Sequence, residues 1–307
     1  MPSLFVIGAG FSKHANFPLG YELFPEVIQL AKKRRLYTNT LKPDIDIYLQ
    51  YISDTRGHRI SEDEINFEDF ISYLDIEHFL WLKGSDTMTD DGNRSQLAVR
   101  NLIALALYLK LESITDADLD LYRTFVRNLE PGDLIISFNY DTLLEIVFEE
   151  LEIPYRLFPT RLVNTGKYGD EVKYPEEEVV LLKVHGSIDW FDKTKFIRDE
   201  KDYLEQGFDM TPRHPVFRDP SNTKPNPIID CPYFDDDPLT RIYRVSELGN
   251  YFLEDSFLLE SPLLISPSSN KIVYINPIRD FWYGFNRRGV GYTKMAIIGF
   301  SLPQHDE

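Results

Sequence analysis

The chain has 307 residues, of which 43% are apolar and 14% aromatic, and its formal net charge is −17. This composition is typical of a globular protein and excludes a wholly disordered chain, while the excess of carboxylates should repel nucleic-acid phosphates. The single cysteine, Cys231, excludes an internal disulfide and a cysteine-based zinc site. Because neither a signal peptide nor a membrane-spanning apolar run is evident, we expect a cytoplasmic protein that does not contact a membrane.

A short apolar strand is expected at residues 4–7, and a glycine-containing loop at residues 8–12 follows it at once. Glycines at such a place let the backbone approach a ligand and expose amide groups to a pyrophosphate. The loop lacks the third glycine of the dinucleotide-binding fingerprint. Residues 20–33 are predicted to form a helix, where that fingerprint expects a second strand ending in an acidic residue. A hydride-transfer enzyme is therefore disfavoured.

Residues 36–130 are expected to form a helical insertion, because apolar side chains recur there at helical spacing without any strand signal. Residues 67–74 and 119–129 show this spacing clearly. Between them, residues 95–112 are predicted to form a strongly apolar helix that lies deep in the insertion. His78 falls in one of these helices, where we interpret it as structural.

The stretch 134–145 is predicted to be a buried strand that ends in Asn139, Tyr140 and Asp141 and turns directly into a helix. Ligands bind at the carboxyl ends of strands in open α/β sheets, because loops and helix N-termini gather there. Polar residues at such a position are therefore site candidates. Asp141 also has a structural interpretation, because its side chain could cap the helix that follows.

A second buried strand begins at residue 179 and ends in His185, Gly186 and Ser187. If it lies parallel to the strand before Asn139, the two polar clusters converge on one crevice. Taken alone, His185 is also consistent with a buried structural histidine. Gly186 favours a functional role, because it removes side-chain bulk where another group must approach.

Shorter elements complete the chain. A brief strand is expected within residues 153–158, and an irregular lobe at about 194–260. A core strand at 263–265 and an aromatic helix at about 277–286 precede a final apolar strand at 295–300. A parallel strand this apolar requires a covering helix, so we expect the chain to be a fragment of a longer one.

The whole pattern predicts an α/β protein with a Rossmann-like parallel sheet, helices on both faces, a helical insertion and a small irregular lobe. The Rossmann-like core would comprise about residues 1–35, 131–193 and 261–307. The helical insertion and the lobe would interrupt this core, so that the chain forms a single domain.

Four segments, taken in order, resemble the SIR2 (sirtuin-like) superfamily: residues 8–12, 138–141, 184–187 and 298–302. In that family they correspond to the NAD-binding glycine loop, the Asn-x-Asp loop, the catalytic His-Gly and the Gly-x-Ser on the adenosine side. Within this superfamily, residues 137–142, 183–187 and 299–306 most resemble the corresponding segments of SIR2-like domains from prokaryotic anti-phage systems. The resemblance implies one SIR2-like domain that hydrolyses NAD to nicotinamide and ADP-ribose and so depletes an infected cell of NAD.

The resemblance assigns catalysis to Asn139 and His185. Asn139 would orient the attacking water, since its amide both donates and accepts hydrogen bonds. His185 would act as a general base or as the partner of a ribose hydroxyl, since imidazole titrates near neutral pH. NAD is then the substrate, and no metal is expected.

The resemblance also implies which residues bind NAD. The amides of the 8–12 loop would hold the diphosphate, and Asp141 would hold the nicotinamide carboxamide or shape its pocket. Gly299 and Ser301 would receive the adenosine ribose, although Ser301 could instead cap a following helix. The full set implied in binding is Gly8, Ala9, Gly10, Phe11, Ser12, Asn16, Asp141, Ser187, Ser266, Gly299 and Ser301.

Two other functions stay open at this point. A non-catalytic module could sense NAD or ADP-ribose and gate a partner protein, although it would need neither Asn139 nor His185. An NAD-dependent deacylase is disfavoured, because deacylases of the family usually carry a four-cysteine zinc ribbon and this chain has one cysteine. The resemblance suggests a homo-oligomer that is activated by a partner or by a C-terminal sensor or ATPase module.

Overall fold

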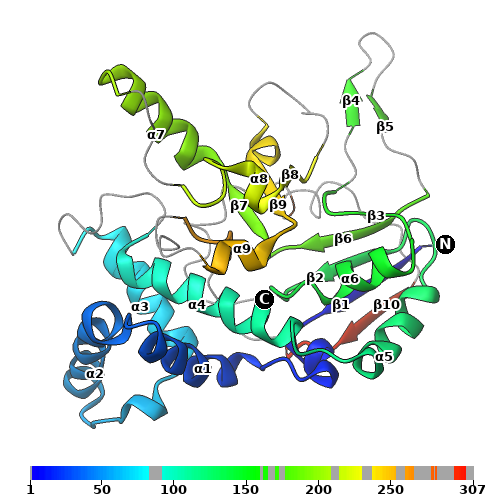
Figure 1. Ribbon diagram of the computed structural model, residues 1–307. Coiled ribbons are helices and arrows are strands. Elements are labelled where there is room, and N and C mark those ends of the chain that lie inside the picture. Colours follow the sequence, from blue (N-terminus) through cyan, green and yellow to red (C-terminus); the bar gives the residue numbers. More distant parts are fainter. Residues whose placement is uncertain are drawn as a thin grey trace.

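The computed structural model describes residues 2–82, 92–159, 177–208, 214–229, 237–253, 260–265 and 294–301, together with residues 278, 279 and 281. It also describes the backbone of residues 162–164 and 170–172. Figure 1 shows a parallel sheet, with the helices of the first third of the chain beside it and a smaller lobe next to both.

A five-stranded sheet in the order β10-β1-β2-β6-β3 forms the centre of the fold, and each strand pairs with its neighbours in parallel. The run 179–183 is buried along its whole length, as expected for a strand of a parallel sheet that is covered on both faces. The prediction of a Rossmann-like α/β sheet is therefore confirmed. The strands are β1 Ser3–Ile7, β2 Leu134–Ser137, β3 Tyr155–Arg156, β6 Val179–Lys183 and β10 Lys294–Ile298.

Among its described residues, the segment between β1 and β2 contains helices joined by turns and loops, and no strand. Helix α4 is buried on nearly every side, because the run of residues 102–107 is entirely apolar and buried. Asn93 caps its first turn. The predicted helix at residues 20–33 is found as α1. These helices are α1 Gly20–Lys33, α2 Lys42–Arg56, α3 Phe67–Phe79, α4 Arg94–Leu111 and α5 Asp116–Arg127, with short 3-10 or π turns at Ala9–Ala15, Tyr37–Leu41 and Glu62–Glu64.

Two aromatic contacts attach α5 to the sheet and to the glycine loop. Phe125 of α5 packs edge-on against Phe5 of β1 and against Phe11 of the loop, with ring centroids 5.3 Å apart in both pairs. The next helix, α6 Leu143–Glu150, starts immediately after β2 and its loop and packs against α5. The sequence order strand, polar loop, helix at residues 134–145 is therefore confirmed.

The lobe predicted to be irregular contains regular structure, so that part of the prediction is wrong. A three-stranded antiparallel sheet has the order β7-β9-β8, and a twelve-residue helix, α7, leaves β7. One residue of this charged helix, Phe196, is buried, but Phe196, Tyr203 and Leu204 recur at helical spacing, so a helical signal was present and was overlooked. The elements are β7 Trp190–Asp192, α7 Thr194–Glu205, α8 Pro220–Thr223, β8 Pro225–Pro227, a 3-10 turn at Pro238–Arg241, β9 Ile242–Val245 and α9 Leu248–Leu253.

Residues 263–265, predicted to be a core strand, do not join the parallel sheet. They form one antiparallel bridge, between Leu264 and Gly186. Leu264 and Ile265 are buried, and an isolated apolar run gives the same signal whether or not it pairs as a strand. The final strand is found at β10, whereas most of the helix expected at 277–286 lies outside the described residues.

The segment after β3 forms a short antiparallel hairpin of β4 Leu162–Asn164 and β5 Asp170–Val172.

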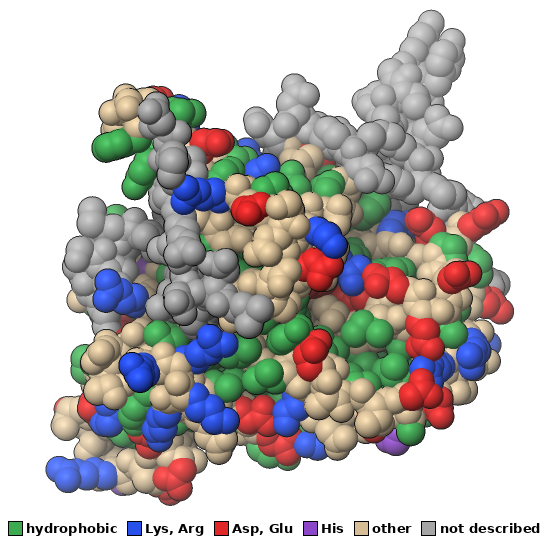
Figure 2. Space-filling view, viewed as in Figure 1, with side chains coloured by type: hydrophobic (Ala, Val, Ile, Leu, Met, Phe, Trp, Pro, Cys, Tyr) green, Lys and Arg blue, Asp and Glu red, His purple; other side chains and the backbone are tan. Residues whose placement is uncertain are grey.

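Among the helices of the described residues, none combines the length and apolarity needed to span a membrane. On the face drawn in Figure 2, acidic and basic side chains are interspersed rather than gathered by sign.

Candidate active site

The carboxyl ends of β1, β2, β6 and β10 border a cavity of about 690 Å³. That volume is within the range typical of small-molecule sites. One wall comes from the loops that follow these strands, and the other comes from the chain around the first turns of α1 and α3. The predicted site residues that line it are Gly8, Ala9, Gly10, Ser12, Asn139, Asp141, His185, Gly299 and Ser301.

Asn139 stands two residues beyond β2 and is 7% exposed. Its Nδ2 donates a hydrogen bond to the Ser12 hydroxyl at 3.1 Å, and its backbone N–H donates to the Ser137 hydroxyl at 3.2 Å. Within the described part of the chain, its buried Oδ1 accepts no hydrogen bond. A buried acceptor without a donor is costly, so this oxygen is suited to a donor on a bound molecule.

Asp141 joins two of the predicted segments. Its Oδ2 accepts a hydrogen bond from the Ser12 hydroxyl at 2.8 Å, and its Oδ1 accepts one from the Leu143 N–H at 3.1 Å. The second contact satisfies an amide at the start of α6, as the capping interpretation expected, although Thr142 occupies the N-cap position and Asp141 stands one residue before it. Asp141 also lines the cavity, and one carboxylate therefore orders the helix start, the glycine loop and the cavity wall.

His185 follows β6 and is 3% exposed, with its ring in the wall of the same cavity. The imidazole stands edge-on to the Phe138 ring, with centroids 5.0 Å apart and planes at 87°. The Tyr140 ring lies 6.1 Å away, and Phe138 in turn stacks on Phe300 at 4.3 Å. The histidine thus sits in a wall of aromatic rings.

Residues 133–226 match the SIR2-like domain family. The match contains Asn139, Asp141 and His185, and it confirms the predicted resemblance over these residues. SIR2-like domains use NAD and are generally enzymes. No curated protein matches the chain.

The glycine loop at residues 8–12 lies outside the matched SIR2-like segment, and it differs from the open phosphate cradle that was expected. The Gly8 N–H donates to the Ile298 carbonyl at 3.1 Å, the Gly10 N–H to the Gly299 carbonyl at 2.8 Å, and the Phe11 N–H to the Gly8 carbonyl at 2.8 Å. These three amides therefore already have acceptors. Close backbone approach is used here to join β1 to the segment after β10, and a diphosphate could use these amides only if that segment separated from the loop.

Tyr122 of α5 fixes the other side of this loop. Its hydroxyl donates to the Phe11 carbonyl at 3.0 Å and accepts from the Ala15 N–H at 3.2 Å. Burial raises the pKa of Tyr122 to about 12, so the hydroxyl keeps its proton at neutral pH. The loop is therefore held from both sides, by α5 and by the chain after β10.

Three of the residues implied in NAD binding lie away from the cavity lining, and their contacts explain why. Phe11 packs against the Tyr122 and Phe125 rings. Asn16 ends the 3-10 turn in a left-handed conformation, with φ of 61°. Ser187 is fully buried in a polar network on the other side of the strand ends. The fourth such residue, Ser266, lies outside the described residues.

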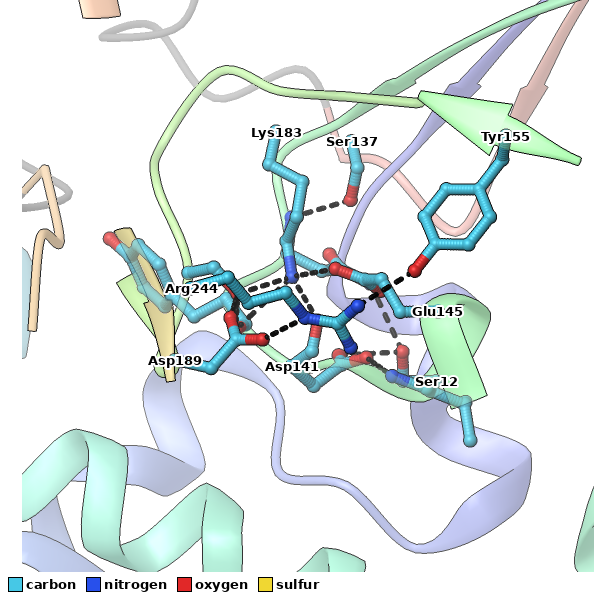
Figure 3. Close-up of polar contacts among 12 residues, drawn as sticks. Ser12, Ser137, Asp141, Glu145, Tyr155, Lys183, Asp189 and Arg244 are labelled. Atoms are coloured by element: carbon cyan, nitrogen blue, oxygen red, sulfur yellow. Dashed lines mark hydrogen bonds and ion pairs between the residues drawn. The ribbon is translucent and has the colours of Figure 1, made fainter. Parts of the chain in front are cut away.

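A buried charge network, which the sequence interpretation missed, connects the end of β6 to the loop after β2 and to α6 (Figure 3). Lys183, the last residue of β6, is 1% exposed, and its Nζ donates to the Glu145 carboxylate at 2.8 Å, the Ser187 hydroxyl at 2.7 Å and the Asp141 carbonyl at 2.5 Å. Asp189 accepts from the Ser187 hydroxyl at 2.5 Å. Burial raises the pKa of Glu145, and the neighbouring Lys183 ammonium opposes that rise.

The same network continues outward through Arg244 of β9. Its Nε donates to the Asp189 carboxylate at 2.7 Å, and its Nη1 contacts the Tyr155 hydroxyl of β3 at 2.8 Å. The parallel sheet and the lobe are therefore joined by charged groups. One feature of the sequence indicates this network: the charged residue Lys183 ends an otherwise apolar strand.

Gly299 should not tolerate a side chain. Its φ is +61°, and a Cβ at this position would lie 2.0 Å from the Phe11 nitrogen. We expect Gly299→Ala to lower the free energy of unfolding by roughly 2–5 kcal/mol, the sum of left-handed strain and overpacking. Gly57→Ala is the matched control, because Gly57 has φ of +72° with nothing within 4 Å, so that strain alone remains. Equal losses in urea denaturation of the two variants would contradict the close packing described for the loop.

Proposed function

We propose that this protein is an NAD glycohydrolase, which cleaves the bond between nicotinamide and ribose and releases nicotinamide and ADP-ribose. The observation that carries the proposal is the buried Oδ1 of Asn139, which accepts no hydrogen bond from the described residues and lies in the same cavity as His185. The SIR2-like match over these two residues supports NAD as the molecule that the cavity takes.

The chemistry requires a water molecule, a base and a dry site. As the carbon–nitrogen bond breaks, the ribose gains oxocarbenium character, the same charge that develops in glycoside hydrolysis. Nicotinamide is cationic in NAD, so it leaves with the bonding electron pair and needs no acid. The oxygen of water bonds to the ribose carbon, and the water proton passes to the base and then to solvent.

Asn139 and His185 have the properties that these steps require. The Asn139 Oδ1 accepts a hydrogen bond from the attacking water and so orients its oxygen toward the ribose. His185 takes the proton of the water or binds a ribose hydroxyl, which are roles suited to an imidazole. The Phe138 and Phe300 rings keep competing water out of the wall beside it, which strengthens electrostatic contacts inside.

The biological role that we propose is depletion of NAD during phage infection. Residues 137–142, 183–187 and 299–306 resemble corresponding segments of SIR2-like domains from anti-phage systems, which supports this role. On this proposal the protein acts as a homo-oligomer that a partner or a sensor module activates. Cellular NAD should then fall after infection only in cells that carry the active protein.

The activity is tested by incubating the purified protein with NAD and measuring nicotinamide by chromatography. Asn139→Ala should reduce nicotinamide release by about 100-fold or more, the loss typical of a positioned catalytic group. Asn128→Ala is the control, because Asn128 is exposed at the end of α5 and should retain activity. Undiminished release by Asn139→Ala would contradict the assignment, whereas NAD binding without release by the wild-type protein would favour a non-catalytic sensor.

A further inference from the structure

Residues 260–265, here called the bracing segment, run along the loop that carries His185. The Leu263 N–H donates to the Trp190 carbonyl at 2.7 Å, the Ser187 N–H to the Leu263 carbonyl at 3.1 Å, and the Ile265 N–H to the His185 carbonyl at 2.9 Å. The backbone on both sides of Gly186 is thus hydrogen-bonded to one segment that follows the lobe.

Gly186 shows how close this contact is. Its φ is +80°, and a Cβ built on it would lie 1.9 Å from the Leu263 carbonyl oxygen. The absence of a side chain at Gly186 therefore makes room for the bracing segment. The group expected to approach Gly186 is thus the Leu263 carbonyl of the protein itself.

Tyr140 links the same segment to the loop that carries Asn139. Its hydroxyl donates to the Ile265 carbonyl at 2.5 Å, and its own carbonyl accepts from the Ile188 N–H at 3.0 Å. Burial raises the pKa of Tyr140, which keeps the proton on the donating hydroxyl. Both strand ends that present the proposed catalytic groups are therefore tied to Ile265.

The other end of the bracing segment is anchored by Glu260, which is buried. Its Oε2 accepts from the Val216 N–H at 2.7 Å, and its Oε1 lies 3.0 Å from His214 Nδ1. The second nitrogen of His214 faces the Asp199 carboxylate of α7 at 3.2 Å. The Glu260 carbonyl accepts from the Tyr251 hydroxyl at 2.9 Å, so the lobe holds this residue through its side chain and its backbone.

We propose that Tyr140 and Glu260 are positioning residues, which act through the bracing segment to hold His185 in register with Asn139. This inference rests on the proposed function. Residues 260–265 are not among those that line the cavity, so Glu260 acts on the reaction indirectly. Tyr140 does line the cavity, but its hydroxyl donates to the Ile265 carbonyl of the bracing segment. The lobe thereby gains a mechanical connection to the catalytic histidine.

The test uses two conservative variants of the full chain, Tyr140→Phe and Glu260→Gln. Tyr140→Phe keeps the ring and removes the hydroxyl that reaches Ile265. We expect kcat for NAD to fall by about 10- to 100-fold, as for a small displacement of a catalytic group, while KM changes less than about twofold. Tyr73→Phe is the matched control. The Tyr73 hydroxyl also donates to one partly buried acceptor, the Glu77 carboxylate, but Tyr73 lies in α3 and does not line the cavity.

A second measurement reports on His185 without relying on activity. In protein labelled at histidine, the NMR signals of the His185 imidazole are identified by their loss in His185→Ala. These signals should shift in Tyr140→Phe and in Glu260→Gln and stay in place in Tyr73→Phe. Unchanged kcat with unchanged signals would overturn the proposal, and so would a change confined to KM.

The two measurements separate this inference from the proposed function. Absence of NAD cleavage by the wild-type protein would remove the proposed function alone. The imidazole signals would then decide the positioning role, because a shift in Tyr140→Phe supports it and fixed signals refute it.

Discussion

Replacing His185 with alanine is expected to reduce nicotinamide release from NAD by about 100- to 10,000-fold, the contribution typical of general acid–base catalysis. The imidazole is buried in the cavity wall and contacts the Phe138 ring, and the proposed mechanism assigns it the role of general base. Initial rates with saturating NAD give the measurement, and thermal unfolding of the same sample shows whether the fold is retained.

His58→Ala is the control for this experiment, because His58 is exposed after α2 and its Nδ1 lies near a backbone carbonyl. It should release nicotinamide at the wild-type rate. A His185→Ala protein that unfolds normally and still cleaves NAD at that rate would leave Asn139 without its proposed partner.

Replacing Lys183 with methionine is expected to lower the free energy of unfolding by about 3–5 kcal/mol. The change leaves the Glu145 carboxylate buried without its cation and removes the donor to the Ser187 hydroxyl and the Asp141 carbonyl. Methionine fills most of the same volume, so the loss comes from charge and hydrogen bonding. Urea denaturation monitored by tryptophan fluorescence measures it.

Lys224→Met is a matched control for this prediction. Lys224 pairs with Glu247 at 2.8 Å, the same separation as in the Lys183–Glu145 pair, but both members of this pair are exposed. Its removal should cost less than about 1 kcal/mol, because solvent screens the pair. Comparable losses in Lys183→Met and Lys224→Met would show that burial of the network does not matter.

Adding Glu145→Gln to Lys183→Met provides a second check. The double variant removes the uncompensated charge, so part of the lost stability should return. A double variant less stable than Lys183→Met would place the defect in the hydrogen bonds to the loops rather than in the buried carboxylate.

The strands and helices with strong periodicity could be predicted from the sequence. The helix at residues 20–33 and the buried strand beginning at Val179 have one clear hydrophobic pattern each, and local pattern decides their structure. Helix α7 was missed although Phe196, Tyr203 and Leu204 recur at helical spacing, because the Pro- and Asp-rich residues that follow it favoured an irregular interpretation of the whole stretch. Residues 263–265 were mistaken for a sheet strand because burial is visible in a sequence, whereas the identity of the pairing partner is not.

Some features of the candidate site could likewise be predicted from the sequence, and others could not. Asn139 and His185 could be placed at strand ends, because polar residues after an apolar run mark the carboxyl edge of a sheet. The Ser187 hydroxyl points to the Lys183 network rather than into the cavity. The sequence does not show this, because it does not reveal to which side of a tight turn a side chain points. The closed hydrogen bonding of the glycine loop depends on a segment almost 300 residues further along the chain.

That closure delays completion of the cavity during synthesis of the chain until residues 294–301 have been made. β10, the last described strand, pairs with β1, the first, and residues 299–301 complete the cavity beside the glycine loop. A chain still on the ribosome has Asn139 and His185 early, but it lacks this wall until residues 294–301 have emerged. If the protein cleaves NAD as proposed, incomplete chains would lack this wall, and we expect cleavage to require a chain that extends at least through residue 301.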